Sequence, residues 1–191
     1  MSNNETLHQL QAPFTAIGAD GQVYPAHKWK VQTTKGGVAV CVPYLDANQV
    51  INRLNEVFGL DGWSNTLIET SDSGMICEIT AIVGGKEVTK SNVGTPSEYE
   101  KQKGQASDAI KRAARNFGIG AYLNDIENVT LKLSGRFAAD GKGNALRTGA
   151  ELTSYINQLH PLRAKLSEIY RAVGKSAGLD NEFQKIWEAL K

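Results

Sequence analysis

The sequence predicts an α+β fold: an antiparallel β-sheet made of two hairpins, packed against a long helix and a shorter helix, with a helical C-terminal appendage. Two stretches rich in β-branched residues are each interrupted by a pair of adjacent glycines, which is typical of β-hairpins. Two other stretches repeat apolar residues at the spacing of an amphipathic helix. The predicted order is β-β-α-β-β-β-α, and strands joined by tight turns pair antiparallel, with helices on one face.

The N-terminal part of the chain combines a polar extension with the first hairpin. Residues 1–26 form the extension, with a short helix expected over 5–11 and irregular chain over 13–25, where two prolines and two glycines occur. The first hairpin is expected over 27–44, turning at Lys35-Gly36-Gly37, because valines alternate along the strand that follows the turn.

The next stretch predicts the shorter helix and the second hairpin. Asp46 is expected to cap a helix over 47–58, whose apolar residues recur at i, i+4, i+7 and i+8. A strand is expected over 63–69. The second hairpin is expected over 75–94, with its turn at Gly84-Gly85.

The long helix is predicted over about 97–117 and has two opposed faces. Its small and apolar residues fall within an arc of roughly 140°, and its cations fall within about 100° nearly opposite. Asp108 shares the cationic arc and is spaced to pair with Lys111 or Arg112. Gly118 and Gly120 are expected to end the helix. The apolar arc comprises Tyr99, Ala106, Ala109, Ile110, Ala113, Ala114 and Phe117, and the cationic arc comprises Lys101, Lys111, Arg112 and Arg115.

The C-terminal third changes character. Residues 133–149 are rich in Gly, Ala and charge and are expected to form a flexible linker. Residues 150–191 have helical patterns, with one segment over 150–159, a second opening at Pro161 and a third ending at Leu190. The predicted regions are therefore an extension (1–26), a core (27–132), a linker (133–149) and a helical C-terminal region (150–191).

The composition limits the kinds of site that the chain can build. With 21 basic and 20 acidic residues the net charge is +1, so an anion-binding site must arise by segregating charges. Cys41 and Cys77 lie in apolar strand patterns, which indicates buried thiols. The histidines are scattered without metal-ligand spacing, so no metal or cofactor is expected. The N-terminus lacks a signal pattern, and no apolar run approaches about 18 residues, so a cytoplasmic protein without membrane contact is expected.

No catalytic constellation can be recognised in the sequence. No Ser, His and Asp grouping suggests a nucleophile and its base. The Gly118-Ile119-Gly120 element follows a helix rather than a strand, which is the wrong context for dinucleotide binding. The sequence therefore predicts a binding protein rather than an enzyme.

Further cations occur in the first hairpin and at the start of the long helix. Lys28 and Lys30 flank Trp29 and share one face of their strand, and Lys35 lies in the turn. If this sheet packs against the long helix, these cations and those of the helix, which begin with Lys101 and Lys103, line one groove suited to single-stranded nucleic acid. On the residues alone, a solvated charged face is the competing interpretation. The rings of Trp29, Tyr44, Trp63 and Tyr122 are better explained as core residues than as stacking surfaces.

Two separated motifs resemble a known family. The first is YLDANQVINRLNEVFGLDGW at 44–63, and the second is KGQASDAIKRAARNFGIGAYL at 103–123. Together and in this order they resemble the Rad-fifty-two-type single-strand annealing proteins, most closely their bacteriophage relatives of the Sak type. The resemblance covers residues 27–123, fades over 1–26 and is absent from about 134 onward.

The resemblance implies a function that spacing alone does not. Proteins of this family have a β-β-β-α core, form closed rings, hold single-stranded DNA in a positive groove and anneal complementary strands without ATP. The family's groove triad matches Lys111, Arg112 and Arg115, and its groove tyrosine matches Tyr44. Many members carry a groove arginine just before the first glycine turn, where this chain has Gln32-Thr33-Thr34. Lys30 or Lys35 is then the substitute. Lys101 and Lys103 are added to the site from the charge pattern of the predicted helix, not from the resemblance.

The leading hypothesis is therefore a strand-annealing protein of phage-type homologous recombination or double-strand-break repair in a bacterial cytoplasm. Its expected partners are single-stranded DNA and further copies of itself, with a host or phage single-strand binding protein or exonuclease as further candidates. Three alternatives stay open at this point: a single-strand DNA protector that does not anneal, a nuclease or nucleotide-using enzyme, and an interaction module whose tail carries the function.

Overall fold

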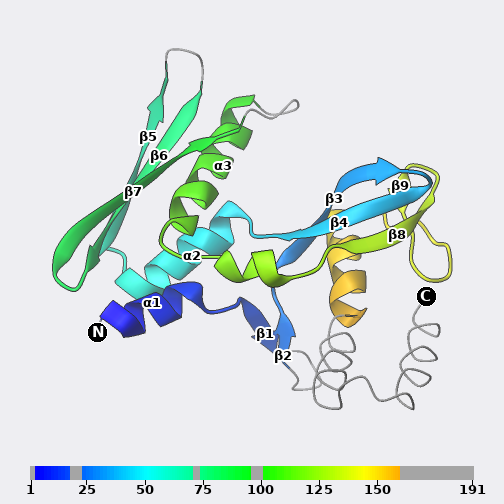
Figure 1. Cartoon of the computed structure of the whole chain (residues 1–191), viewed down its shortest axis with the longest axis horizontal. Coiled ribbons are helices and arrows are strands. Elements are labelled where there is room, and N and C mark those ends of the chain that lie inside the picture. Colours follow the sequence, from blue (N-terminus) through cyan, green and yellow to red (C-terminus); the bar gives the residue numbers. More distant parts are fainter. Residues whose placement is uncertain (1–2, 18–22, 71–73, 96–100, 160–191) are drawn as a thin grey trace. The chain divides into compact units, whose positions relative to one another are not determined.

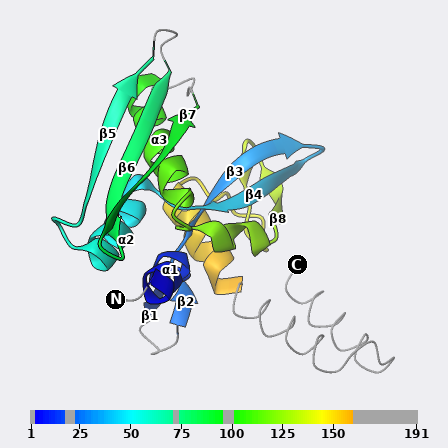
Figure 2. The same cartoon turned by 60° about the vertical axis from the view of Figure 1, so that its left-hand side comes forward.

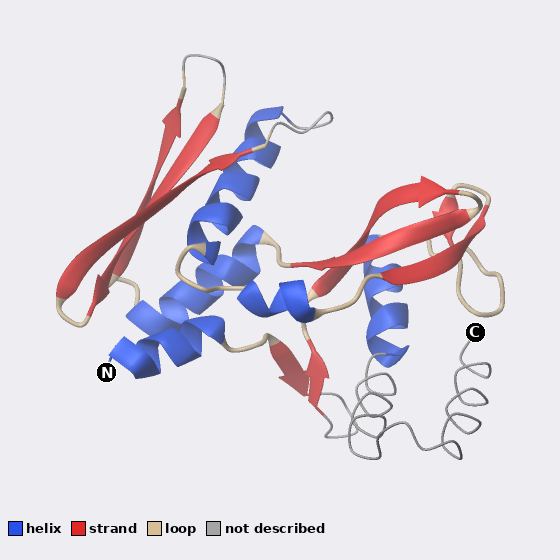
Figure 3. Cartoon of the chain, in the orientation of Figure 1, coloured by secondary structure: helices blue, strands red, loops and turns tan. Residues whose placement is uncertain are grey.

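The computed structural model describes residues 3–17, 23–70, 74–95 and 101–159 (Figure 1). The chain forms two compact units, each built from two stretches: residues 1–13 with 44–126, and residues 14–43 with 127–191. Helices and antiparallel strand pairs occur in both units (Figure 3), which confirms the predicted α+β class.

In the first unit, a long helix lies along one face of a three-stranded antiparallel sheet (Figures 1 and 2). Alternate residues of the central strand and the small residues of the helix are fully buried, so the core lies between them. These residues are Cys77, Ile79, Ala81, Ala109, Ala113 and Ala114. The elements are α1 (Asn3–Gln11), α2 (Ala47–Phe58), β5 (Trp63–Glu69), β6 (Met75–Val83), β7 (Lys86–Gly94), α3 (Lys101–Arg115) and the 3-10 helix η1 (Ala121–Asp125).

The shorter helix α2 begins where the sequence predicts. The carboxylate of Asp46 accepts a hydrogen bond from the Gln49 amide at 2.8 Å, and the Gln49 side chain accepts one from the Asp46 amide at 3.1 Å. This reciprocal pair is a capping box, which satisfies amide groups that a helix start otherwise leaves unbonded. The ring of Phe58, the last residue of α2, meets the ring of Phe117 edge-on with centroids 6.4 Å apart.

A buried arginine of α2 fixes the N-terminal helix. Arg53 Nη1 donates to the carbonyls of Gln9 and Ala12 at 2.6 and 2.8 Å, and its Nε donates to Glu56 at 3.2 Å. The two carbonyls lie at and just beyond the end of α1, where a helix leaves its acceptors unsatisfied. The expected helix at 5–11 is therefore present, begins at Asn3 and is held against α2.

The long helix ends as predicted, at a pair of glycines. The last residue of α3 is Arg115, and Gly118 and Gly120 both have positive φ, at 98° and 74°. The Ile119 amide donates to the Ala114 carbonyl at 3.3 Å, which closes the final turn. The predicted start of the helix at 97 falls on residues 96–100, which lie outside the described part of the chain.

The second unit contains a four-stranded sheet of order β3-β4-β8-β9 and a small hairpin, β1-β2. The hairpin corrects the expectation of irregular chain over 13–25, because Thr15 pairs with Pro25 and Ile17 with Val23. Strands of three residues are too short for an alternating pattern to be visible in the sequence. The elements are β1 (Thr15–Ile17), β2 (Val23–Pro25), β3 (Lys28–Lys35), β4 (Val38–Tyr44), β8 (Val129–Ser134), β9 (Phe137–Ala138) and a helix over 149–159.

The helix over 149–159 confirms the expected segment at 150–159 and packs on β3. Trp29 is only 1% exposed; its amide donates to Thr153 Oγ1 at 3.0 Å and its Nε1 donates to Asn157 Oδ1 at 2.9 Å. Asn157 also donates to the carbonyls of Pro25 and His27. Trp29 is thus a core residue, as its alternation with two exposed lysines indicated. The two later helices expected in the C-terminal region lie outside the described residues.

The two predicted hairpins belong to different sheets. In the second unit, β4 of the hairpin β3-β4 pairs with β8, with Val38 opposite Lys132 and Cys41 opposite Val129. In the first unit, β6 of the hairpin β6-β7 pairs with β5. Within 133–149, β8 and β9 pair and Ala139 bridges to Ala145, so this segment has more hydrogen-bonded structure than its composition indicated. The division into four functional regions stays a prediction. Among the described residues, no helix is long and apolar enough to cross a membrane.

Candidate nucleic-acid interface

The cationic stripe predicted on the long helix is present on α3. Three of its cations lie on the side opposite the buried alanines: the side chains of Lys111 and Arg112 are 29% and 48% exposed, and Arg115 is also exposed. Lys101, the fourth cation of the predicted arc, is the first residue of α3. The helix therefore presents positive charge to solvent while its other face is fixed in the core.

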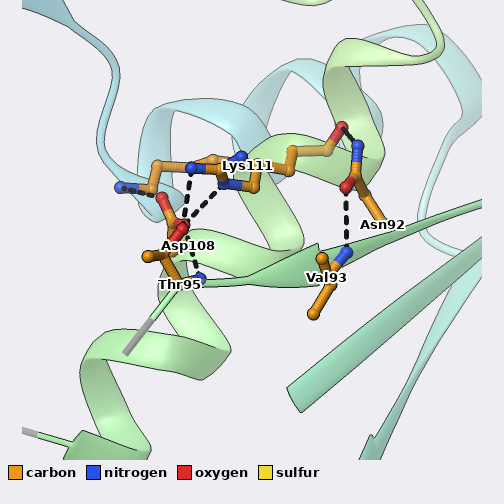
Figure 4. A network of polar contacts seen from close by, with 6 residues as sticks. Asn92, Val93, Thr95, Asp108 and Lys111 are labelled. Carbon is orange, nitrogen blue, oxygen red and sulfur yellow. Dashed lines mark hydrogen bonds and ion pairs between the residues drawn. The ribbon is translucent and has the colours of Figure 1, made fainter. Parts of the chain in front are cut away.

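One acidic residue sits within this stripe and connects α3 to the end of β7 (Figure 4). The carboxylate of Asp108 accepts hydrogen bonds from Arg112 Nε at 2.7 Å and from the Thr95 amide at 3.0 Å, and it lies 3.8 Å from Lys111 Nζ. Arg112 Nη2 donates to Thr95 Oγ1 at 2.8 Å. We call Thr95, Asp108, Lys111 and Arg112 the Asp108 network. The sequence predicted that Asp108 pairs with Lys111 or Arg112, and the structure has both ion pairs.

The Asp108 network holds its carboxyl group ionised. Burial alone would raise the pKa of Asp108, but the hydrogen bonds from Thr95 and Arg112 and the charges of Arg112 and Lys111 outweigh it. The pKa of this carboxyl therefore lies below its usual value of 3.8. At neutral pH the Asp108 network combines two cations with one anion.

A close backbone contact positions the Asp108 network. Gly94, the last residue of β7, is buried, and a Cβ placed there would lie 2.1 Å from the Gln105 carbonyl oxygen of α3. Only glycine allows the strand to approach the helix this closely. The approach brings the following residue, Thr95, within reach of Asp108 and Arg112.

Two further contacts fix the C-terminal end of the stripe. Arg115 Nη2 donates to the side-chain oxygen of Asn124 in η1. Asn116 Nδ2 donates to the Ser91 carbonyl of β7 at 2.9 Å. The last turn of α3 is therefore bonded both to the sheet and to the segment that follows the helix.

Lys103 lies away from the stripe. At about 100° per residue, Lys103 is roughly 180° around α3 from Arg112, about 120° from Arg115 and about 80° from Lys111, so it lies outside the arc of the stripe. Its side chain is exposed, but it does not share the face of the other cations.

The remaining predicted contacts belong to the other hairpin. Lys30 and Lys35 are exposed residues of β3, and Tyr44, the last residue of β4, is half-buried. The hypothesis of one common groove assumed that α3 packs on this sheet. Instead α3 packs on β6 and β7, so a groove that joins the two sets of cations stays a prediction.

Several side chains that contact a cation were not predicted from the sequence. Thr95 and Asn124 are partners of Arg112 and Arg115, and nothing in their local sequence indicates it. In the second unit, the guanidinium carbons of Arg136 and Arg147 lie 5.0 and 6.0 Å from the centroid of the Phe137 ring. Arg136 and Phe137 are adjacent in the sequence, but the glycines and charges around them favour a linker. In the described ranges, no three His, Cys, Asp or Glu side chains are grouped to hold a metal ion.

Comparison with known proteins gives a family match over most of this region. The family model described as Rad52/22 family double-strand break repair protein matches residues 9–136, which is more than half of the 191-residue chain. The match includes β3, β4, α2 and the whole of the first unit's sheet and α3.

Three curated relatives are similar to the chain. The single-stranded DNA-binding protein DdrA of Deinococcus deserti is 32% identical over 132 residues, which cover 66% of this chain and 60% of DdrA. DdrA of Deinococcus radiodurans is 32% identical over 138 residues, covering 66% and 58%. The DNA repair and recombination protein radC of Emericella nidulans is 32% identical over 124 residues, covering 52% and 21%. The chain thus spans about three fifths of the two Deinococcus relatives and about a fifth of the Emericella one.

Proposed function

Because the chain belongs to the Rad52/22 family of double-strand break repair proteins, we propose that it binds single-stranded DNA and anneals complementary strands without ATP. The reaction serves phage-type homologous recombination or double-strand-break repair in a bacterial cytoplasm. The proposed activity requires no nucleophile, general base or cofactor, since pairing of the bases supplies the driving force.

The observation that carries the proposal is the stripe formed by Lys111, Arg112 and Arg115 on α3. Cations held on one face of a packed helix bind the phosphates of a strand, and release of condensed counterions supplies the affinity. Contacts to phosphates leave the bases of the bound strand open to pair with a second strand. The bonds from Arg112 to Thr95 and from Arg115 to Asn124 hold the C-terminal part of the stripe in a fixed shape.

The other predicted contacts extend this site. Lys101 continues the stripe at the N-terminal end of α3. Lys103 contacts a DNA strand that curves around the helix. Lys30 or Lys35 supplies the positive charge that many family members place before the first glycine turn, and Tyr44 lines the groove. The assignments of Lys30, Lys35 and Tyr44 stand on the family resemblance, and those of Lys101 and Lys103 stand on the charge pattern of the helix; Lys30, Lys35 and Lys103 are exposed.

An annealing assay tests the proposal. Two complementary oligonucleotides, one carrying a fluorophore and the other a quencher, are mixed with increasing protein and without ATP. An annealing protein accelerates quenching above the spontaneous rate. Metal-dependent cleavage of the oligonucleotides that survives repurification and disappears in a point variant would instead establish a nuclease and refute the proposal.

A second candidate function is protection of single strands without annealing. It is favoured by the similarity to the two Deinococcus relatives, both of which are single-stranded DNA-binding proteins. The same assay separates the two functions, since a protector binds each strand and slows quenching.

We also propose that the chain assembles into a closed ring. On the face of the β5-β6-β7 sheet away from α3, Ile68, Ile76 and Val93 form one cross-strand row, and Ile68 and Val93 are 41% and 52% exposed. Such an apolar row favours burial against another subunit. Light scattering at micromolar concentration is expected to show a homo-oligomer, and electron microscopy is expected to show rings. A monomer in light scattering would contradict the proposed assembly. A single-strand binding protein or exonuclease of host or phage is the further partner to test.

A further inference from the structure

The acidic residue within the α3 stripe has a consequence for DNA binding. We propose that Asp108 competes with the DNA phosphates for cations, an inference that rests on the proposed function. The Asp108 carboxylate is bonded to Arg112 and attracts Lys111, so a bound DNA strand must share these two cations with it. Asp108 therefore weakens binding and keeps it reversible, by acting through its two neighbours.

The contacts support competition at defined atoms. The carboxylate accepts a hydrogen bond from Arg112 Nε at 2.7 Å and lies 3.8 Å from Lys111 Nζ. A DNA phosphate offers the same chemistry, two anionic oxygens that accept charge-assisted hydrogen bonds from a guanidinium or an ammonium group. Figure 4 shows Asp108 between Lys111 and the end of β7, on the helix face that carries the proposed phosphate contacts.

Arg112 keeps the capacity to bind a phosphate while it is paired. A guanidinium group carries five N–H donors. One of them, on Nε, donates to Asp108, and one on Nη2 donates to Thr95. Among the described residues no partner is found for Nη1, so a phosphate can approach that edge without breaking the Asp108 network.

The charge balance of the site follows from these contacts. Lys111 and Arg112 carry two positive charges and Asp108 carries one negative charge, so the three residues together carry a net charge of about +1. The Asp108 side chain is only 28% exposed, so solvent does not fully screen its effect on these two cations. Without the carboxylate the same helix face would attract phosphates more strongly.

The decisive variant is Asp108→Asn, which removes the charge and keeps the shape of the side chain. Single-strand binding should tighten roughly three- to tenfold at low salt, the effect of one charge about 6 Å from a phosphate at a dielectric of about 40 to 80. The slope of log K against log salt should also become steeper by about 0.7, because one more cation is available to exchange its counterion. The probe is a fluorescent oligothymidine, measured by anisotropy across a salt series.

Three control variants separate competition from other effects. Asp61→Asn removes the same charge from an exposed position between α2 and β5. It should change the affinity and the salt slope by less than half as much as Asp108→Asn does. Thr95→Val removes the hydroxyl that Arg112 contacts but leaves all charges, and should leave the salt slope unchanged. In the background Lys111→Gln with Arg112→Gln, Asp108→Asn should tighten binding less than it does in the wild-type chain, because only the direct repulsion between the carboxylate and the phosphates remains. Equal tightening in the two backgrounds would overturn the competition for these cations.

The outcomes decide the inference and the proposed function separately. Asp108→Asn binding that is unchanged, weaker, or no tighter than that of Asp61→Asn overturns the competition while the proposed function stands. A wild-type chain without salt-dependent binding of single strands overturns both. Asp108→Ser is the second variant, and either one decides the question if the other does not fold.

Discussion

The contact between Gly94 and α3 predicts a large effect for the smallest possible substitution, Gly94→Ala. The added Cβ would lie 2.1 Å from the Gln105 carbonyl oxygen and 3.0 Å from the Ala109 nitrogen. Since ordinary contacts begin at 3.4 Å, strand and helix must separate by more than an ångström. Overpacking of this kind costs about 1–3 kcal/mol, and we expect the upper end because both opposing atoms belong to the backbone of α3.

Chemical and thermal unfolding measure this cost. A loss of about 3 kcal/mol corresponds to a drop in Tm of about 6–12 °C for a chain of this size. The matched control is Gly149→Ala, at the start of the helix over 149–159, where an added Cβ meets no atom within 4 Å. This control should be neutral or stabilising by about 0.4–1 kcal/mol. Equal stability of the two variants would refute the argued contact between β7 and α3.

Three further outcomes follow from buried or paired polar groups. Arg53→Met removes the donor of two hydrogen bonds to backbone carbonyls at the end of α1. It should lower the free energy of unfolding by about 2–4 kcal/mol and increase amide hydrogen exchange in α1. Unchanged exchange would contradict the claim that Arg53 holds α1 against α2. Because the pKa of Asp108 lies below 3.8, its stabilising effect is complete above that pH and is lost as the pH falls through the lowered value. The stability advantage of wild type over Asp108→Asn should therefore shrink in acid, and a constant difference down to about pH 2 would exclude this assignment. Burial raises the pKa of the Cys41 and Cys77 thiols to about 11, so a thiol reagent at pH 8 should label them only after unfolding; rapid labelling of the native protein would show that they are accessible.

The elements that local sequence specifies were predictable. Asp46 and Gln49 lie within one turn of each other, so the start of α2 needs no distant partner. The cationic and apolar faces of α3 follow from helical geometry alone, and Asp108 reaches its cations at i+3 and i+4. The same geometry separates Lys103 from the stripe, so its contact with DNA stays a prediction.

Features that depend on long-range pairing were not predictable. The pairing of β4 with β8 brings Val38 opposite Lys132, and no local pattern specifies such a distant partner. The burial of Trp29 was predictable, but its hydrogen bonds to Thr153 and Asn157, which lie far along the chain, were not. Thr95 meets Arg112 only because Gly94 lets β7 approach α3, and a single glycine at a strand end does not reveal that contact.

The salt dependence of single-strand binding tests the central claim most directly. Wild-type protein is compared with the double variant Lys111→Gln with Arg115→Gln, which leaves the bonds between Arg112, Asp108 and Thr95 intact. Each phosphate contact to a single strand contributes about 0.7 to the slope of log K against log salt, so the double variant should be shallower by about 1.4. The exposed pair Lys86→Gln with Lys142→Gln is the control of equal charge and should keep the wild-type slope. Equal slopes for wild type and the α3 double variant would contradict the claim that this helix holds the DNA backbone.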